Sequence, residues 1–158
     1  MSEEQKQEFT LRIAQANSTA LVVILYDMIL SYLADAKEHC LRADDILFSE
    51  DLRKARGCIQ ELIASLNGEY EVADNLKHLY WFAIRRLAQC QYQHDAGLLK
   101  QLNSMFTSLR DAYATVAKED DRLPVMDHSQ TIYAGLTYGR NQLTENVTDS
   151  GTNRGFCV

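Results

Sequence analysis

Residues 24–33, ILYDMILSYL, hold eight apolar or aromatic side chains and one carboxylate, Asp27, near the middle. At helical spacing these residues and their neighbours put apolar groups on almost every side of one helix. The main stripe is Leu21, Ile24, Leu25, Met28 and Tyr32. A helix that is apolar nearly all round is buried nearly all round. We therefore expect a core helix.

Three neighbours in a four-helix bundle would not cover every side of this helix. Four elements could lie on the remaining side: an N-terminal helix, the C-terminal segment, a second copy of the chain, or a helix of another protein. The first two make it an ordinary core helix covered by its own chain. The last makes it a groove for an amphipathic client helix. The residues leave both alternatives open.

Composition limits the class of protein and of partner. The chain has 158 residues, enough for one domain with a sizeable core, and a formal net charge of −6. An acidic chain is a poor match for nucleic acid or an anionic membrane surface. The start MSEEQKQEFT lacks the basic and apolar regions of a signal peptide, and ALVVIL is too short to span a membrane. We therefore expect a cytoplasmic protein with reduced cysteines and no membrane insertion.

The spacing of apolar residues before Pro124, the only proline, predicts five helices. We expect them at about 3–16, 18–43, 49–67, 69–93 and 95–119, with Asn17 or Ser18 capping the second and Ser49 the third. Their core stripes include Val72, Leu79 and Val116. Short connections favour an all-α, antiparallel up-down four-helix bundle with an extra short N-terminal helix. The predicted domain is about 1–123, with a bundle core at about 17–118.

The segment after Pro124 differs in composition, with four glycines and many Thr, Asn and Ser residues. It nevertheless keeps aromatic residues such as Tyr133, Tyr138 and Phe156, which a purely flexible tail does not need. We interpret 124–158 as a loosely ordered C-terminal extension that docks on its own bundle or on a partner. We expect it to occupy the client surface when no client is present, so deleting 124–158 should tighten client binding.

No constellation for bond chemistry is visible. The residues three positions before the four histidines are Ala36, Asn75, Gln91 and Val125, so the Glu-x-x-His motif of di-iron bundles is missing. Cys90 and His94 have helical spacing but no evident further ligands, and no phosphate-binding loop or nucleophile elbow occurs. We predict no catalytic, cofactor or metal site and do not expect an enzyme.

Asp27 needs a partner if it is buried, because an unpaired buried charge is costly. Arg86 is the candidate, since it lies at the edge of the inward stripe of the fourth helix. A structural Asp27–Arg86 ion pair would fix the register of the second and fourth helices. The alternative is that Asp27 faces water beside Ser31.

Three blocks of sequence carry a family resemblance: LYDMILSYLADAK at 25–37, ELIASLN at 61–67 and NLKHLYWFAIRRLAQC at 75–90. In this order they resemble the FliS family of flagellin-specific export chaperones. The resemblance implies a cytosolic helical bundle that binds the C-terminal helical region of flagellin. Such a protein prevents premature polymerisation and delivers flagellin to the flagellar export apparatus. The family resemblance also allows contact with a flagellar anti-sigma factor, so a non-catalytic adaptor for another client is the alternative.

The groove implied by this resemblance is placed on the most apolar helix. We predict partner contacts from one side by Leu21, Ile24, Leu25 and Met28, with Tyr80 and Ile84 facing them from the fourth helix. Most of these residues fit the protein core equally well.

Overall fold

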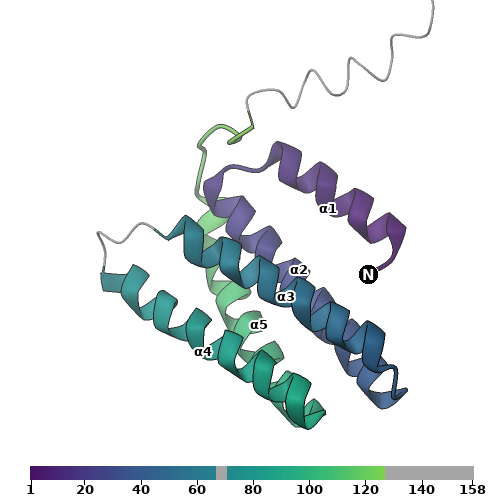
Figure 1. Ribbon diagram of the computed structural model, residues 1–158. Helices are drawn as coiled ribbons and strands as arrows, with labels where there is room; N and C mark the ends of the chain where they lie inside the picture. Colours follow the sequence, from purple (N-terminus) through teal and green to yellow (C-terminus); the bar gives the residue numbers. More distant parts are fainter. Residues whose placement is uncertain (67–70, 127–158) are drawn as a thin grey trace, which may run out of the picture. The chain divides into compact units, whose positions relative to one another are not determined.

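The computed structural model describes residues 1–66 and 71–126, which form five helices (Figure 1). They are α1 (Glu3–Gln15), α2 (Ser18–Leu41), α3 (Asp45–Ser65), α4 (Glu71–Gln93) and α5 (Ala96–Lys118). No strand occurs in these two ranges, and the all-α prediction is confirmed. The predicted behaviour of the C-terminal extension concerns residues beyond 126. It lies outside the described residues and stays a prediction.

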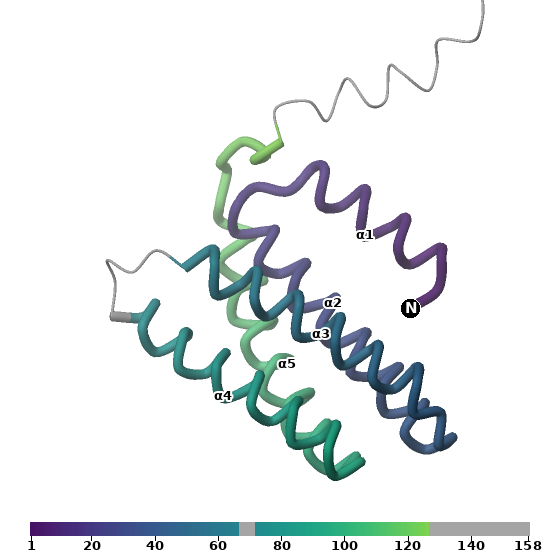
Figure 2. The backbone as a smooth tube through the Cα atoms, in the orientation of Figure 1, coloured from purple at the N-terminus to yellow at the C-terminus, as the bar shows by residue number. Residues whose placement is uncertain are grey.

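Helices α2 to α5 run alternately up and down and form a four-helix bundle, as predicted (Figure 2). Helix α2 packs against α3 and α5, and α4 packs against the same two helices. Helices α2 and α4 are therefore diagonal to each other. The extra helix α1 packs on α2. One of the four proposed covers for α2 is thus the N-terminal helix of the chain itself.

Apolar stripes from all four bundle helices fill the core. Its largest completely buried side chains are Tyr26, Ile29, Phe48, Leu52, Ile59, Leu62, Tyr80, Leu87, Leu99, Leu102 and Phe106. Three residues that the periodicity assigned to the core, Val72, Leu79 and Val116, are instead exposed.

Polar caps set the helix starts. The Asn17 side chain accepts a hydrogen bond from the backbone N–H of Ala20, as expected for a cap. The predicted start of α3 at Ser49 is wrong, because the helix begins four residues earlier. Asp44 caps it by accepting from the N–H of Leu47 at 3.1 Å, after Ala43 turns the chain with φ 56°. The α2–α3 connection is therefore a tight turn.

Helix α2 is apolar and long enough, by length and composition, to cross a membrane. The expectation that this region is too short holds only for the ALVVIL segment, not for the complete helix. The core helix of a bundle meets the same criterion, and Ile24, Tyr26, Ile29, Leu33 and Ala36 of α2 are buried.

Candidate partner-binding site

The six predicted groove residues do not form two walls of one groove, because α2 and α4 are diagonal. Ile24 and Tyr80 are core residues, 4% and 1% exposed. The other four are partly buried: Leu25, Met28 and Ile84 pack against the core, and Leu21 lies on α2. A partner role for these residues stays a prediction.

Tyr26 and Tyr80 connect the diagonal helices at the centre of the bundle. Their hydroxyl groups hydrogen-bond to each other, and the ring of Tyr113 from α5 packs edge-on against Tyr26 at 5.6 Å. Burial raises the pKa of both phenols, that of Tyr80 to about 12. Both hydroxyls therefore keep their protons near neutral pH, and the contact is a neutral hydrogen bond inside an apolar core.

An apolar crevice of about 350 Å³ opens beside Tyr80, where α3 ends and α4 begins. None of the described residues that line it is charged. Its lining comes from four helices and comprises Val22, Leu62, Ser65, Leu66, Val72, Ala73, Leu76, Tyr80 and Tyr113. Of the predicted groove residues, only Tyr80 is among them. Periodicity did not indicate this crevice, because it assigned Val72 to a closed core.

A second recess of similar size lies between α1, α2 and α5. Ile24 and Val23 contribute its apolar part, and Arg12 and Lys118 add charge. This recess is less suited to a purely apolar side chain than the crevice beside Tyr80. The predicted residues Ile24 and Tyr80 thus line two separate hollows.

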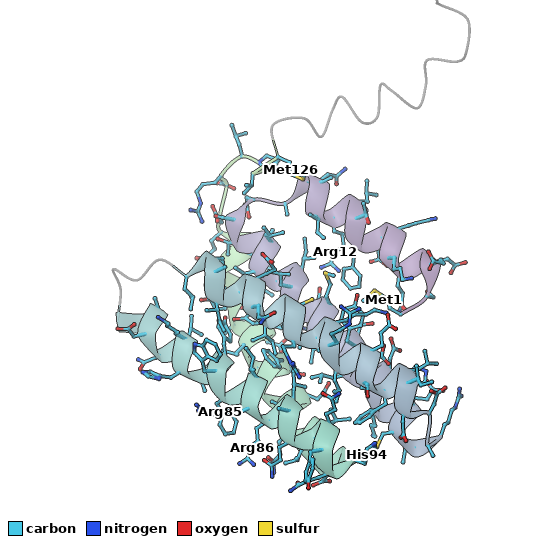
Figure 3. All side chains as sticks on the ribbon, viewed as in Figure 1. Met1, Arg12, Arg85, Arg86, His94 and Met126 are labelled. Atoms are coloured by element: carbon cyan, nitrogen blue, oxygen red, sulfur yellow. The ribbon has the colours of Figure 1, made fainter. Side chains whose placement is uncertain are left out.

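The predicted Asp27–Arg86 ion pair is wrong. Asp27 instead binds Arg12 of α1, with an N–O distance of 2.6 Å, and lies 3.7 Å from Arg110 Nε of α5. Arg86 donates to Gln89 at 2.8 Å within α4. Figure 3 shows Arg12 between α1 and the bundle and Arg86 on the outer side of α4. The diagonal placement of α2 and α4 keeps Arg86 away, and the added helix α1 supplies the cation.

Two ion pairs join the N-terminal segment, residues 1–15, to α2. Besides Arg12–Asp27, the N-terminal ammonium group of Met1 pairs with Asp35. No side chain of α1 is buried. The carboxylate within the most apolar segment therefore has a structural role, which is to hold the helix that covers α2.

The chain after α5 returns to the corner between α1 and α2. The Val125 N–H donates to the Ala16 carbonyl at 3.0 Å, and the Asn17 side chain donates to the Asp120 carbonyl at 2.9 Å. The Asp120 carboxylate accepts from Arg122 and Thr19, which lowers its pKa from the usual value. Residues 120–125 thus tie the end of the bundle domain to its beginning.

Asp51, two residues after the predicted cap Ser49, is buried within α3. Its carboxylate lies 2.7 Å from His39 Nδ1 of α2. This pair lies at the end of the bundle away from the crevice. The burial of Asp51 was not predicted because α3 starts earlier than expected. With a start at Asp45, Asp51 is no longer in the first turn and lies on the same face as Phe48 and Leu52.

Across 1–66 and 71–126, no group of three His, Cys, Asp or Glu side chains is arranged to hold a metal ion. Within the part of the chain that the structure describes, Cys40, Cys58 and Cys90 form no disulfide with one another. Burial raises the pKa of Cys58 and of Cys90 to about 11, so both thiols stay protonated near neutral pH.

Comparison with known protein families identifies the family to which this bundle belongs. The family described as flagellar protein FliS matches residues 1–120 of the chain. The chain belongs to the FliS family. That match covers all five helices, α1 included.

Two curated relatives agree with this assignment. The flagellar secretion chaperone FliS of Bacillus subtilis is 31% identical over 93 residues, covering 59% of this chain and 70% of the relative. The protein of the same name from Salmonella typhimurium is 29% identical over 108 residues, covering 66% of this chain and 80% of the relative.

Proposed function

We propose that this FliS-family protein is a cytosolic export chaperone for flagellin. In this role it binds the C-terminal helical region of flagellin, prevents premature polymerisation and delivers flagellin to the export apparatus. Both curated relatives are named flagellar secretion chaperones, which supports the chaperone role. The proposal needs no bond chemistry, only a surface that binds a polymerising segment and later releases it.

The observation that carries the proposal is the crevice beside Tyr80, whose described lining residues are all uncharged. Segments that polymerise by burying apolar helix faces must have those faces covered by a chaperone. A crevice of about 350 Å³ accepts one or two large apolar side chains, and the surrounding helix surfaces extend the contact. Val72 stands at its mouth with 66% of its surface exposed, so it is available to a client.

The test is a calorimetric titration with the C-terminal segment of flagellin from the same organism. Far-ultraviolet circular dichroism of the mixture would report helix gained by the segment. Val72→Glu places a charge at the crevice mouth, and Ile46→Glu is its matched control. Both are β-branched residues in the first turn of a helix, 66% and 81% exposed, and they lie at opposite ends of the bundle.

We expect saturable one-to-one binding by the unaltered protein. Val72→Glu should weaken it about tenfold or more, because an interface anchor contributes over ~1 kcal/mol, and Ile46→Glu should leave it unchanged. No binding by the unaltered protein would refute the flagellin proposal. Equal effects of the two substitutions would show that the crevice is not the binding surface.

A further inference from the structure

The outer face of α4 exposes large apolar side chains that no described part of the chain covers. Trp81 and Phe82 are 46% and 37% exposed and Tyr92 is 88% exposed, whereas Leu79, 39% exposed, lies at the edge of this face. This face is distinct from the crevice, whose α4 residues are Val72, Ala73, Leu76 and Tyr80. Several exposed aromatic side chains on one side of a helix mark an interaction site more often than scattered single residues do.

The same face is cationic on an acidic protein, with Arg85 near its centre and Lys77 and Arg86 at its two edges. Residues 75–94 include Lys77, Arg85 and Arg86 but no Asp or Glu, whereas the whole chain carries a net charge of −6. None of these three cations forms an ion pair with a described carboxylate. The Arg86 guanidinium lies over the Phe82 ring at 5.0 Å. Figure 3 shows Arg85 and Arg86 on the side of α4 turned away from the other helices.

The spacing along this face suits a helical partner. His78, Phe82, Arg85, Gln89 and Tyr92 recur at alternating intervals of four and three residues. Residues at these intervals form one line along a helix, which is the geometry by which two helices pack. Apolar and aromatic groups along that line supply contact area, and the arginines select the charge of the partner.

We propose that the outer face of α4, residues 77–92, docks an acidic amphipathic helix of a partner protein other than flagellin. Such a helix presents apolar side chains along one line with carboxylates beside them. Its carboxylates would form ion pairs with Lys77, Arg85 and Arg86. Because the crevice and this face are separate, the chaperone can hold its client and this partner at the same time.

Two other occupants fit less well. A second copy would offer the acidic outer side of α1, with Glu3, Glu4 and Glu8 exposed. Helices α1 and α4 lie on opposite sides of the bundle (Figure 1), so that contact would not close into a dimer. Each basic residue near an anionic membrane contributes only about 1 kcal/mol to the binding free energy, and the net charge of −6 opposes membrane binding.

The probe is a synthetic amphipathic helix of three heptads with a leucine line flanked by glutamates. A matched peptide carries lysines at the flanking positions. Binding to the full-length protein is followed through Trp81, the only tryptophan, which lies on the proposed face. The test variant is Arg85→Glu with Arg86→Glu. The control is Lys37→Glu with Lys100→Glu, which makes the same charge change at exposed sites on α2 and α5.

We expect the glutamate peptide to bind at least about tenfold more tightly than the lysine peptide, with an affinity that falls as salt rises. The Arg85/Arg86 variant should lose about tenfold and the control variant nothing. Protein saturated with the flagellin segment should bind the peptide as before. If the double variant does not fold, Arg85→Glu alone, at an exposed position, replaces it.

Equal binding of the two peptides, or equal loss in the control variant, would overturn the proposal. So would displacement of the peptide by the flagellin segment, which would make this face part of the client site. If the protein self-associates without peptide and Arg85→Glu abolishes this association, the face is an interface with a second copy. Loss of binding to vesicles of anionic lipid in that variant, without peptide binding, would assign it to a membrane. Peptide binding without flagellin binding would leave this proposal standing and remove the flagellin function.

Discussion

Removing either hydroxyl of the Tyr26–Tyr80 pair should destabilise the bundle, whereas removing both should cost little more. The two hydroxyls bond only to each other among the described contacts, and the residues are 0% and 1% exposed. Tyr26→Phe therefore strands the Tyr80 hydroxyl in an apolar core, and Tyr80→Phe strands that of Tyr26. An unsatisfied buried polar group costs about 1–3 kcal/mol, whereas replacing both partners by apolar groups of similar shape is nearly neutral.

The measurement is a double-mutant cycle by urea unfolding, followed by far-ultraviolet circular dichroism near pH 7. We expect each single variant to lose about 1–3 kcal/mol of unfolding free energy. The double variant should lose no more than either single, which gives a coupling energy of at least about 1 kcal/mol. Tyr92→Phe, at an 88% exposed position, is the control and should change stability by less than about 0.5 kcal/mol. Additive losses in the cycle would refute a direct hydrogen bond across the diagonal.

Three more predictions concern pH, α1 and the far end of the bundle. Since burial raises the folded pKa of Tyr26 and Tyr80, their contribution to stability is complete below the unfolded value of about 10 and is lost as pH rises toward 12. Urea midpoints should fall over that range, and less in the double Phe variant; equal falls would contradict the assignment. Asp27→Asn should speed amide hydrogen exchange throughout α1 while costing the bundle only about 1 kcal/mol or less, because its ion pairs are partly solvated; unchanged exchange in α1 would mean that these pairs do not hold it. His39→Ala should cost about 1–3 kcal/mol in urea unfolding by leaving the Asp51 carboxylate unpaired in the core, and a loss below about 0.5 kcal/mol would show that water replaces the histidine.

The fold could be predicted from sequence because periodicity and breakers both pointed to it. The stripes of α2 to α5 and the absence of proline before Pro124 were sufficient for an up-down bundle. Helix boundaries were predicted less accurately where the sequence offers two possible N-cap residues. At α3 the N-cap is Asp44 and not Ser49, because Ala43 adopts a positive φ that lets the chain turn within three residues. That conformation is uncommon for alanine, so sequence alone did not indicate it.

The site was harder to predict, because it depends on which helices are neighbours. Periodicity says which side of a helix is apolar but not which helix faces it. A pairing of α2 with α4 led to both the Asp27–Arg86 pair and the two-walled groove. In the structure these helices are diagonal, and Arg12 takes the place of Arg86. Helix α1 was predicted, but its contact with Asp27 was not. Arg12 and Asp27 are 15 residues apart in the sequence, and no local pattern indicates that they form a pair.

The residues at which periodicity and fold disagree are informative. Val72 and Leu79 match the core pattern of α4, yet the structure leaves them 66% and 39% exposed. Disagreement between local pattern and fold is expected where a surface is kept for a partner, because apolar groups there gain nothing from folding alone. Val72 borders the crevice and Leu79 borders the cationic outer face. A sequence that only had to fold could hold polar residues at both positions, and the two contacts that we propose would account for their apolar character.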